Sequence, residues 1–373
     1  MPQNVDALKG VASLVAIVLL AACGSSSTAS HRSPAASAPR SAGPSPSISP
    51  AASPSPAPQI TGGYEVLVTQ GSADTYSVSI IGVDGRVVAS AQPSSPTLVT
   101  CGDASAAVLP LPVSTTGTRV YFLDAGGNVN FLTPNGETGV ATHVPTGGLT
   151  RSMFSVSPDD QRIAVVQDTF TSSGATTVLF AEDLNGGTNH VKLFTQTGAF
   201  SLWPIGWHGT NNLVLAKVAS CSQGGGPFCC GPLELHVVDP ATAVRRFTLG
   251  GSACVIAGPP SPVGVVCEDT KSFTKASVLD WTGATLRTIA IQGPTSAYLS
   301  PDGSSVAFAT NTSTTFEGIK QTLDLVACNW IDGTHVIAGG DTQSQARIGD
   351  VTNGALAPVA AQGTCGGRLP GGF

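Results

Sequence analysis

Short apolar runs alternate with polar turn residues over most of the chain beyond residue 60, and the alternation repeats. In one turn class, small and polar residues precede a run rich in β-branched residues, which is typical of a strand. The copies of this first turn class are Ser114–Gly117, Ser157–Asp160, Ser300–Gly303 and Ile331–Gly333, with fainter copies at Trp207–Gly209 and Pro259–Pro262. In Ser300–Gly303, Pro presets the backbone, Asp bonds back to it, and Gly takes the positive-φ position that completes the reversal.

A second turn class alternates with the first and ends apolar runs with Asn-Gly, Asp-Gly or a related pair; the first two pairs are strong hairpin signals. Its copies are Asp84-Gly85, Asn135-Gly136, Asn185-Gly186, Asp239-Pro240, Thr282-Gly283 and Asn353-Gly354. The repeat unit is therefore four strands. Copies of the first class lie about 30 to 52 residues apart, close to the roughly 40–50 residues of a propeller blade. Two places break the alternation: no first-class turn precedes Asp84-Gly85, and no clear second-class turn follows Ser300–Gly303.

No segment keeps the 3.6-residue apolar period of a helix, so the sequence predicts an all-β fold. A single β-propeller of seven blades, one of them degenerate, fits the turns best. Six blades and a two-domain β-sandwich are the alternatives. Closure of a propeller would require a strand from one end of the chain to complete a blade begun by the other, which removes exposed sheet edges.

The first-class turns resemble the TolB-type repeat, a WD-like propeller blade in which Ser-Pro-Asp-Gly marks the turn between the first two strands. The resemblance covers most of residues 62–362. Ser300–Gly303 fits the motif, and Ser157–Asp160 has Asp in place of the final Gly. The resemblance implies a β-propeller and says little about function. TolB itself adds an N-terminal α/β domain where this chain has a low-complexity segment, so its partners are not carried over.

The N-terminal segment has a different pattern. A mostly apolar run of 13 residues, Gly10–Ala22, follows Lys9. At about 1.5 Å per residue it reaches roughly 20 Å, which is too short to cross about 30 Å of hydrocarbon but suits the core of a secretory signal. The residues that end it, Leu20-Ala21-Ala22-Cys23, resemble the lipobox of bacterial lipoproteins. This resemblance implies that Cys23 is lipidated and begins the mature chain; an ordinary signal peptide with a chance Cys is the alternative.

Three segments follow from these patterns. Residues 1–22 are predicted to be a lipoprotein signal peptide. Residues 23–59, almost entirely Ser, Pro, Ala and Gly, cannot bury enough apolar surface to offset their ordering entropy, so we expect a disordered tether. Residues 60–373 are predicted to form the propeller. The expected location is the extracytoplasmic face of the cell membrane, with a lipid anchor at Cys23.

Charge and composition limit the classes of molecule that we expect this chain to bind. Charged residues are 11% of the chain, the net charge is −6, and there is no basic stripe, so we expect no nucleic-acid partner. We expect a monomer that meets the membrane only through its lipid anchor.

Eight cysteines follow Cys23, and an even set in an exported chain indicates up to four disulfides, whose pairing the sequence leaves open. Cys254 and Cys267 flank a Gly-Pro-Pro-Ser-Pro turn and are expected to face each other across two strands. Cys221 with Cys229 or Cys230 could close a Gly-rich loop. The other candidates are Cys101, Cys328 and Cys365. A zinc site is a weaker alternative because the spacings match no ribbon or finger.

No motif for catalysis or metal binding is present. No His pair has i, i+4 spacing, and Gly-x-Ser-x-Gly and the dinucleotide fingerprint are missing. We therefore expect no metal and no cofactor, and we interpret His236 as a strand-face residue. Weak binding candidates are Trp203, Trp207 and His208, because they stand where other repeats have a simple turn. In the alternative interpretation, the two tryptophans pack in the core of their blade.

The sequence thus favours a non-catalytic binding or scaffold module that recognises an envelope protein or glycan. A rigid ring of hairpins presents several loops on one face, and a tether gives it reach. The alternative is a propeller enzyme, such as a lyase or glycan hydrolase, with its site in a central funnel.

Overall fold

The computed structural model describes residues 62–373 apart from 71–73, 98, 100–112, 172–173, 221–227, 229–233 and 294. The predicted signal peptide, tether and lipidated Cys23 lie outside the described residues, as do Cys101, Cys221, Cys229 and Cys230. Among the described residues every regular element is a strand, and no helix is long and apolar enough to span a membrane.

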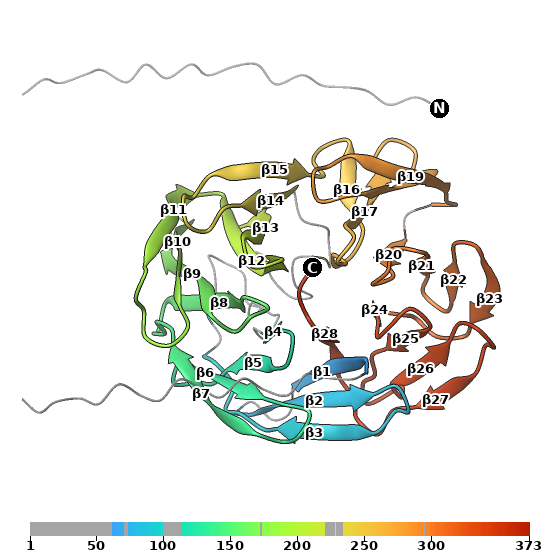
Figure 1. Ribbon diagram of the computed structural model, residues 1–373, viewed down its shortest axis with the longest axis horizontal. Coiled ribbons are helices and arrows are strands. Elements are labelled where there is room, and N and C mark those ends of the chain that lie inside the picture. The colour runs from blue at the N-terminus through green and yellow to red at the C-terminus, as the bar shows by residue number, and fades with distance from the viewer. Residues whose placement is uncertain are drawn as a thin grey trace, which may run out of the picture. The chain divides into compact units, whose positions relative to one another are not determined.

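The strands form seven four-stranded antiparallel sheets, which are arranged as the blades of a ring (Figure 1). The first three blades, each given from its innermost strand outward, are β28 (Thr364–Leu369), β1 (Tyr64–Gln70), β2 (Tyr76–Gly82) and β3 (Val87–Ala91); β4 (Val113–Thr115), β5 (Val120–Leu123), β6 (Asn128–Leu132) and β7 (Thr138–His143); and β8 (Thr150–Val156), β9 (Arg162–Thr171), β10 (Gly174–Asp183) and β11 (Val191–Gly198).

The remaining four blades follow in chain order. They are β12 (Phe200–His208), β13 (Asn212–Ala219), β14 (Glu234–Val238) and β15 (Arg245–Leu249); β16 (Cys254–Ile256), β17 (Val265–Asp269), β18 (Lys275–Leu279) and β19 (Thr285–Ala290); β20 (Ser296–Leu299), β21 (Val306–Ala309), β22 (Thr314–Phe316) and β23 (Ile319–Leu323); and β24 (Asn329–Trp330), β25 (His335–Ala338), β26 (Arg347–Asp350) and β27 (Leu356–Pro358). The prediction of a seven-bladed propeller is confirmed, and six blades and a β-sandwich are excluded.

Ring closure explains the first break in the turn pattern. The innermost strand of blade 1 is β28, from the C-terminal end, and its other three strands come from the beginning of the described chain. Tyr64 pairs with Leu369, just as His208 pairs with Asn212 across the first-class turn of blade 4. Blade 1 therefore needs no covalent turn at this point.

The second break is resolved in blade 6. Its second-class turn is Glu317-Gly318, between β22 and β23, with Gly318 at φ +73°. Glu is not a preferred residue of a two-residue hairpin turn, so the pair carries no strong signal in the sequence. First-class turns join the first two strands of a blade and second-class turns the last two. Because the strands alternate in direction, both classes lie on one face of the ring, which we call the turn face.

Blades are tied to each other by buried aromatic side chains that donate to a neighbouring blade. The Tyr76 hydroxyl donates to the Leu123 carbonyl at 2.5 Å, Trp207 Nε1 to that of Ser155 at 3.3 Å, and Trp330 Nε1 to that of Tyr298 at 2.8 Å. These rings bury large apolar surfaces while their polar atoms remain paired. Apolar clusters accordingly run across neighbouring blades: one joins blades 1 and 2, and another joins blades 3, 4 and 5.

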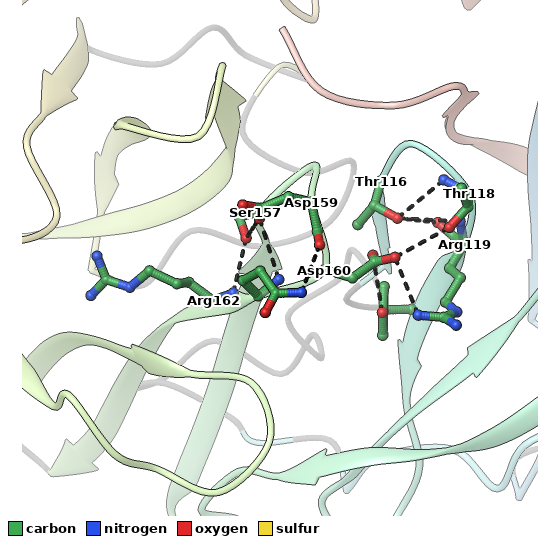
Figure 2. A network of polar contacts seen from close by, with 9 residues as sticks. Thr116, Thr118, Arg119, Ser157, Asp159, Asp160 and Arg162 are labelled. Atoms are coloured by element: carbon green, nitrogen blue, oxygen red, sulfur yellow. Dashed lines mark hydrogen bonds and ion pairs between the residues drawn. The ribbon is translucent and has the colours of Figure 1, made fainter. Parts of the chain in front are cut away.

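Blade 3 departs from the Ser-Pro-Asp-Gly motif for a structural reason (Figure 2). Asp160 takes the positive-φ position at φ 59°, and its carboxylate reaches back to blade 2. It accepts from the Thr118 hydroxyl at 3.2 Å and the Tyr121 hydroxyl at 3.1 Å, and it pairs with Arg119 Nη1 at 3.2 Å. Burial, and then the charge of Asp160, raise the pKa of Tyr121, so its hydroxyl keeps the proton that it donates.

Two disulfides are present among the described cysteines. Cys254 and Cys267 join β16 to β17 within blade 5, with 5.4 Å between their Cα atoms, as the turn between them predicts. Cys328 precedes β24 of blade 7 and pairs with Cys365 of β28, with a Cα–Cα distance of 6.0 Å. The second bridge therefore fastens the closing strand of the ring to the blade beside it.

Candidate binding site between the third and fourth blades

A cavity of about 290 Å³ lies between blades 3 and 4. Strands β10 to β15 and the turn before β15 supply its lining: Leu179, Leu193, Phe194, Phe200, Leu202, Leu215, Lys217, Glu234, His236, Val238, Ala243 and Arg245. Two kinds of side chain make up this lining. Leu179, Leu202, Leu215 and Val238 are buried, and we call them the apolar base; Lys217, Glu234, His236 and Arg245 are polar, and we call them the charged wall. Ligand pockets commonly combine an apolar lining with a few convergent polar groups, and this volume suits a side chain or a small chemical group.

The charged wall follows from strand register. Lys217 of β13 and Glu234 of β14 are direct cross-strand partners, and His236 lies two residues further along β14, on the same face. Lys217 Nζ donates to Glu234 Oε1 at 2.9 Å, and His236 Nε2 lies 2.8 Å from the same oxygen. Arg245 Nη1 from β15 lies 3.3 Å from His236 Nε2.

Electrostatics give this wall a net positive charge near neutral pH. Hydrogen bonding from His236, and then from Lys217, lowers the pKa of Glu234, so this group is a carboxylate. Burial lowers the pKa of His236 and favours its neutral form. Two cations, Lys217 and Arg245, then face one carboxylate. The Lys217 ammonium also lies 4.8 Å from the ring centre of Phe200, at the border between the charged wall and the apolar base.

A buried carboxylate also couples blades 3 and 4. Asp168 of β9 is fully buried and pairs with Arg151 at 2.8 Å. Its other oxygen accepts from the hydroxyls of Thr177, at 2.7 Å, and of Ser201 in blade 4, at 2.9 Å. The Arg151 guanidinium lies 4.9 Å from the ring centre of Trp203. Because removal of one partner would leave a buried charge without compensation, this cluster fixes the spacing of blades 3 and 4.

The predicted binding residues differ in their exposure to solvent. Trp203 and Trp207 are 1% and 0% exposed, so neither ring offers a surface to a partner, and both pack in the core as in the alternative interpretation. His208 is half-buried at the turn face, with its ring 5.0 Å from that of Trp281.

The pocket residues were not identified from the sequence. The sequence predicts only a strand-face residue at His236, whereas the structure places it in a pocket with Lys217 and Glu234. The alternation of polar and apolar residues in β14 hints at a polar face. The pairing with Lys217, however, depends on the register between β13 and β14, and no local pattern encodes it.

Within the part of the chain that the structure describes, no three His, Cys, Asp or Glu side chains gather as a metal site would require. The acidic turn residues bond to nearby backbone and hydroxyl groups. Asp302, for example, accepts from Ser300 and Ser304, which lowers its pKa.

The described chain is thus a seven-bladed β-propeller with a pocket between two blades. No protein-family model and no curated protein sequence matches it. Solved structures similar to it include "Crystal Structure of Mitotic Checkpoint Complex" (13% identity, TM-score 0.44, 74% of this chain and 83% of that chain). Dihydro-heme d1 dehydrogenase NirN in complex with DHE is similar at 14% identity and TM-score 0.45, over 84% and 76% of the two chains. BamB from Moraxella catarrhalis is similar at 14% identity and TM-score 0.37, over 83% of each. At these values the similarities carry no inference about function.

Proposed function

We propose that this protein is a lipid-anchored, extracytoplasmic binding module that recognises an envelope protein without catalysis. The observation that carries the proposal is the pocket between blades 3 and 4, in which Lys217, Glu234, His236 and Arg245 stand above an apolar base. The polar groups are already paired, so the pocket is preorganised and little ordering accompanies binding.

The composition of the pocket favours a protein over a glycan as its ligand. Half of its lining consists of Leu and Phe side chains, which gain from burying an apolar side chain but offer a sugar no hydrogen bonds. The two cations at the wall favour a neighbouring carboxylate. An apolar side chain beside an Asp or Glu in a partner protein satisfies both halves of the pocket.

In this proposal the predicted N-terminal segments determine where the protein is located. Lipidation of Cys23 would hold the mature chain at the membrane, and the 36 residues that follow, Gly24–Gln59, would span about 35 Å as a coil. We also assign the repeats to the TolB type in this proposal. That assignment bears on the fold and does not identify a partner.

A photo-crosslinking experiment tests the proposal in intact bacterial cells that express the full-length chain. Benzoylphenylalanine replaces Phe194 at the pocket or Val140 on β7, which is 61% exposed and serves as the control site. We expect a discrete crosslinked protein from position 194 alone. Its yield should fall at least five-fold when Lys217→Ala and Arg245→Ala are combined.

Two outcomes would contradict the proposal. One is the same set of products from positions 194 and 140, since the pocket would then have no specific partner. The other is a product that is removed by glycosidases and resists proteases, which would assign the pocket to a glycan.

A further inference from the structure

The last residues of the sequence run from the closing strand β28 to the centre of the ring, where Figure 1 marks the C-terminus. This tail, Pro370–Phe373, crosses the first-class turns of successive blades. Gly371 donates its N–H to the Thr116 carbonyl of blade 2 at 2.7 Å. Gly372 passes so close to Pro158 of blade 3 that a Cβ atom on Gly372 would lie 2.8 Å from that ring.

The tail ends on blade 4 in a strand-like pairing. Phe373 donates its N–H to the Trp207 carbonyl at 2.7 Å, and its own carbonyl accepts from the Gly209 N–H at 3.1 Å. The same oxygen lies 2.9 Å from His208 Nδ1, which donates to it. Main-chain bonds of this kind hold any extended peptide, whatever its side chains.

The aromatic ring of Phe373 has its own built slot. It stacks on Trp281 of blade 5 with 5.5 Å between ring centres, and Trp281 stacks in turn on His208 at 5.0 Å. Trp281 is 6% exposed and its Nε1 donates to the Pro262 carbonyl at 3.0 Å, so the slot wall is fixed by its own blade. The ring also fits only because residue 206 is Gly: a Cβ there would overlap the Phe373 ring.

We propose that this aromatic slot, made by Gly206–Gly209 and Trp281, is a recognition site for an extended peptide segment of a partner protein that carries an aromatic side chain. The tail Gly371–Phe373 occupies it in cis. The main-chain pairing supplies affinity and the slot supplies selection for an aromatic ring. The slot shares no residue with the pocket between blades 3 and 4, so the proposal goes beyond the proposed function and can hold or fail without it.

The probe is a fluorescent peptide, Leu-Pro-Gly-Gly-Phe, blocked at both ends. We compare the intact chain with a variant that lacks residues 370–373 and retains all of β28, and we measure binding by fluorescence anisotropy. The shortened chain should bind the peptide saturably. The intact chain should bind it at least 10-fold more weakly, because its own tail fills the slot. A peptide with Ala in place of Phe should also bind at least 10-fold more weakly.

Gly206→Ala in the shortened chain should abolish peptide binding by filling the slot. Gly198→Ala, at the end of β11 where nothing but the Gln196 amide lies within 4 Å of the added Cβ, should leave it unchanged. Should the shortened chain not fold, Phe373→Ala in the intact chain replaces it. This variant keeps the main-chain bonds of the tail but leaves the aromatic slot empty, so the same peptide should bind to it more tightly than to the intact chain.

Absence of binding to a folded variant with an empty slot, or equal binding of the Phe and Ala peptides, would overturn the proposal. So would Gly206→Ala binding as well as its control. Concentration-dependent dimers of the intact chain that disappear with Phe373→Ala would reassign the slot to a second copy of this chain.

Discussion

Asp160 shows how a single side chain can replace a motif residue and gain a second contact. Gly would adopt φ 59° without strain, whereas Asp is one of the few other residues that tolerate this region. In exchange, its carboxylate binds Arg119, whose side chain is only 7% exposed and stacks over Phe131 at 4.9 Å. The substitution converts a local turn into a bond between blades.

Asp160→Gly restores the motif and should nevertheless destabilise the protein. It removes the carboxylate from a largely buried guanidinium, and we expect a loss of about 2 kcal/mol in the free energy of unfolding, measured by urea denaturation. Asp84→Ala is the control, since its pair with Arg86 is exposed and should contribute less than about 1 kcal/mol. Equal effects of the two substitutions would show that the bond between blades 2 and 3 contributes nothing.

Glu65 of β1 should make stability depend on pH. Its carboxyl group is fully buried at the ring closure, where it accepts from Asn329 of blade 7 at 2.9 Å and from the Gly367 N–H of β28 at 3.3 Å. Burial raises its pKa well above the usual range despite these donors and the nearby Arg368. The folded state therefore binds this proton more tightly than the unfolded state does.

The sign of the effect follows by linkage. The stabilisation is fully present below the unfolded pKa of about 4.3 and is lost as pH rises through the raised folded value. We expect the thermal midpoint to fall above pH 4.5 by more in the parent protein than in Glu65→Gln. His236, whose lowered pKa acts in the opposite sense, is present in both proteins and cancels in the difference. Parallel profiles for the two proteins would contradict the role of Glu65.

Among the elements, β28 is the one on which the ring depends. Within its sheet it pairs only with β1, and the register of that pairing shifts once, between Val66 and Leu67. It is also the one strand of blade 1 that comes from the C-terminal end of the described chain. The Cys328–Cys365 bridge holds it to blade 7 from the other side. Sheet pairing and a covalent bond thus act together at the one place where the chain could open.

The two disulfides should therefore differ in effect. In the chain-entropy account, the bridge with a sequence separation of 37 contributes about 4 kcal/mol and the one with a separation of 13 about 3 kcal/mol. Cys328→Ala with Cys365→Ala should lower the urea midpoint more than Cys254→Ala with Cys267→Ala, and limited proteolysis should remove the C-terminal residues first. The reverse order of stability would show that the closing bridge is dispensable.

Turn chemistry made most of the elements predictable. Local sequence alone predicts the turns at Ser300–Gly303 and Asn135-Gly136, because Pro, Asn and Gly restrict or permit backbone conformations in their own segment. The partner of β1 lies about 300 residues away and gives no local signal. Only the closure that a propeller requires predicts it, as a strand from the other end of the chain, and the pairing with β28 confirms this. The pocket was missed because it gives no local signal either: Lys217, Glu234 and Arg245 meet only after three strands have paired in one register.

At the scale of the whole molecule, the proposed membrane attachment can be tested separately from the fold. In cells that process bacterial lipoproteins, Cys23→Ser should block lipidation and move the protein out of the membrane fraction, while the purified propeller keeps its thermal midpoint. Mass spectrometry of the parent protein should find a mature N-terminus at Cys23 with acyl chains attached. An unmodified N-terminus at another residue would remove the anchor from the proposed function.

The closure at Tyr64 and Leu369 has one more consequence. These two residues stand to each other as Asn212 and His208 do on either side of a three-residue turn, so a short linker could join them in place of the tail. The ring would then be circularly permutable, with new ends at the exposed connection Thr146-Gly147 between blades 2 and 3.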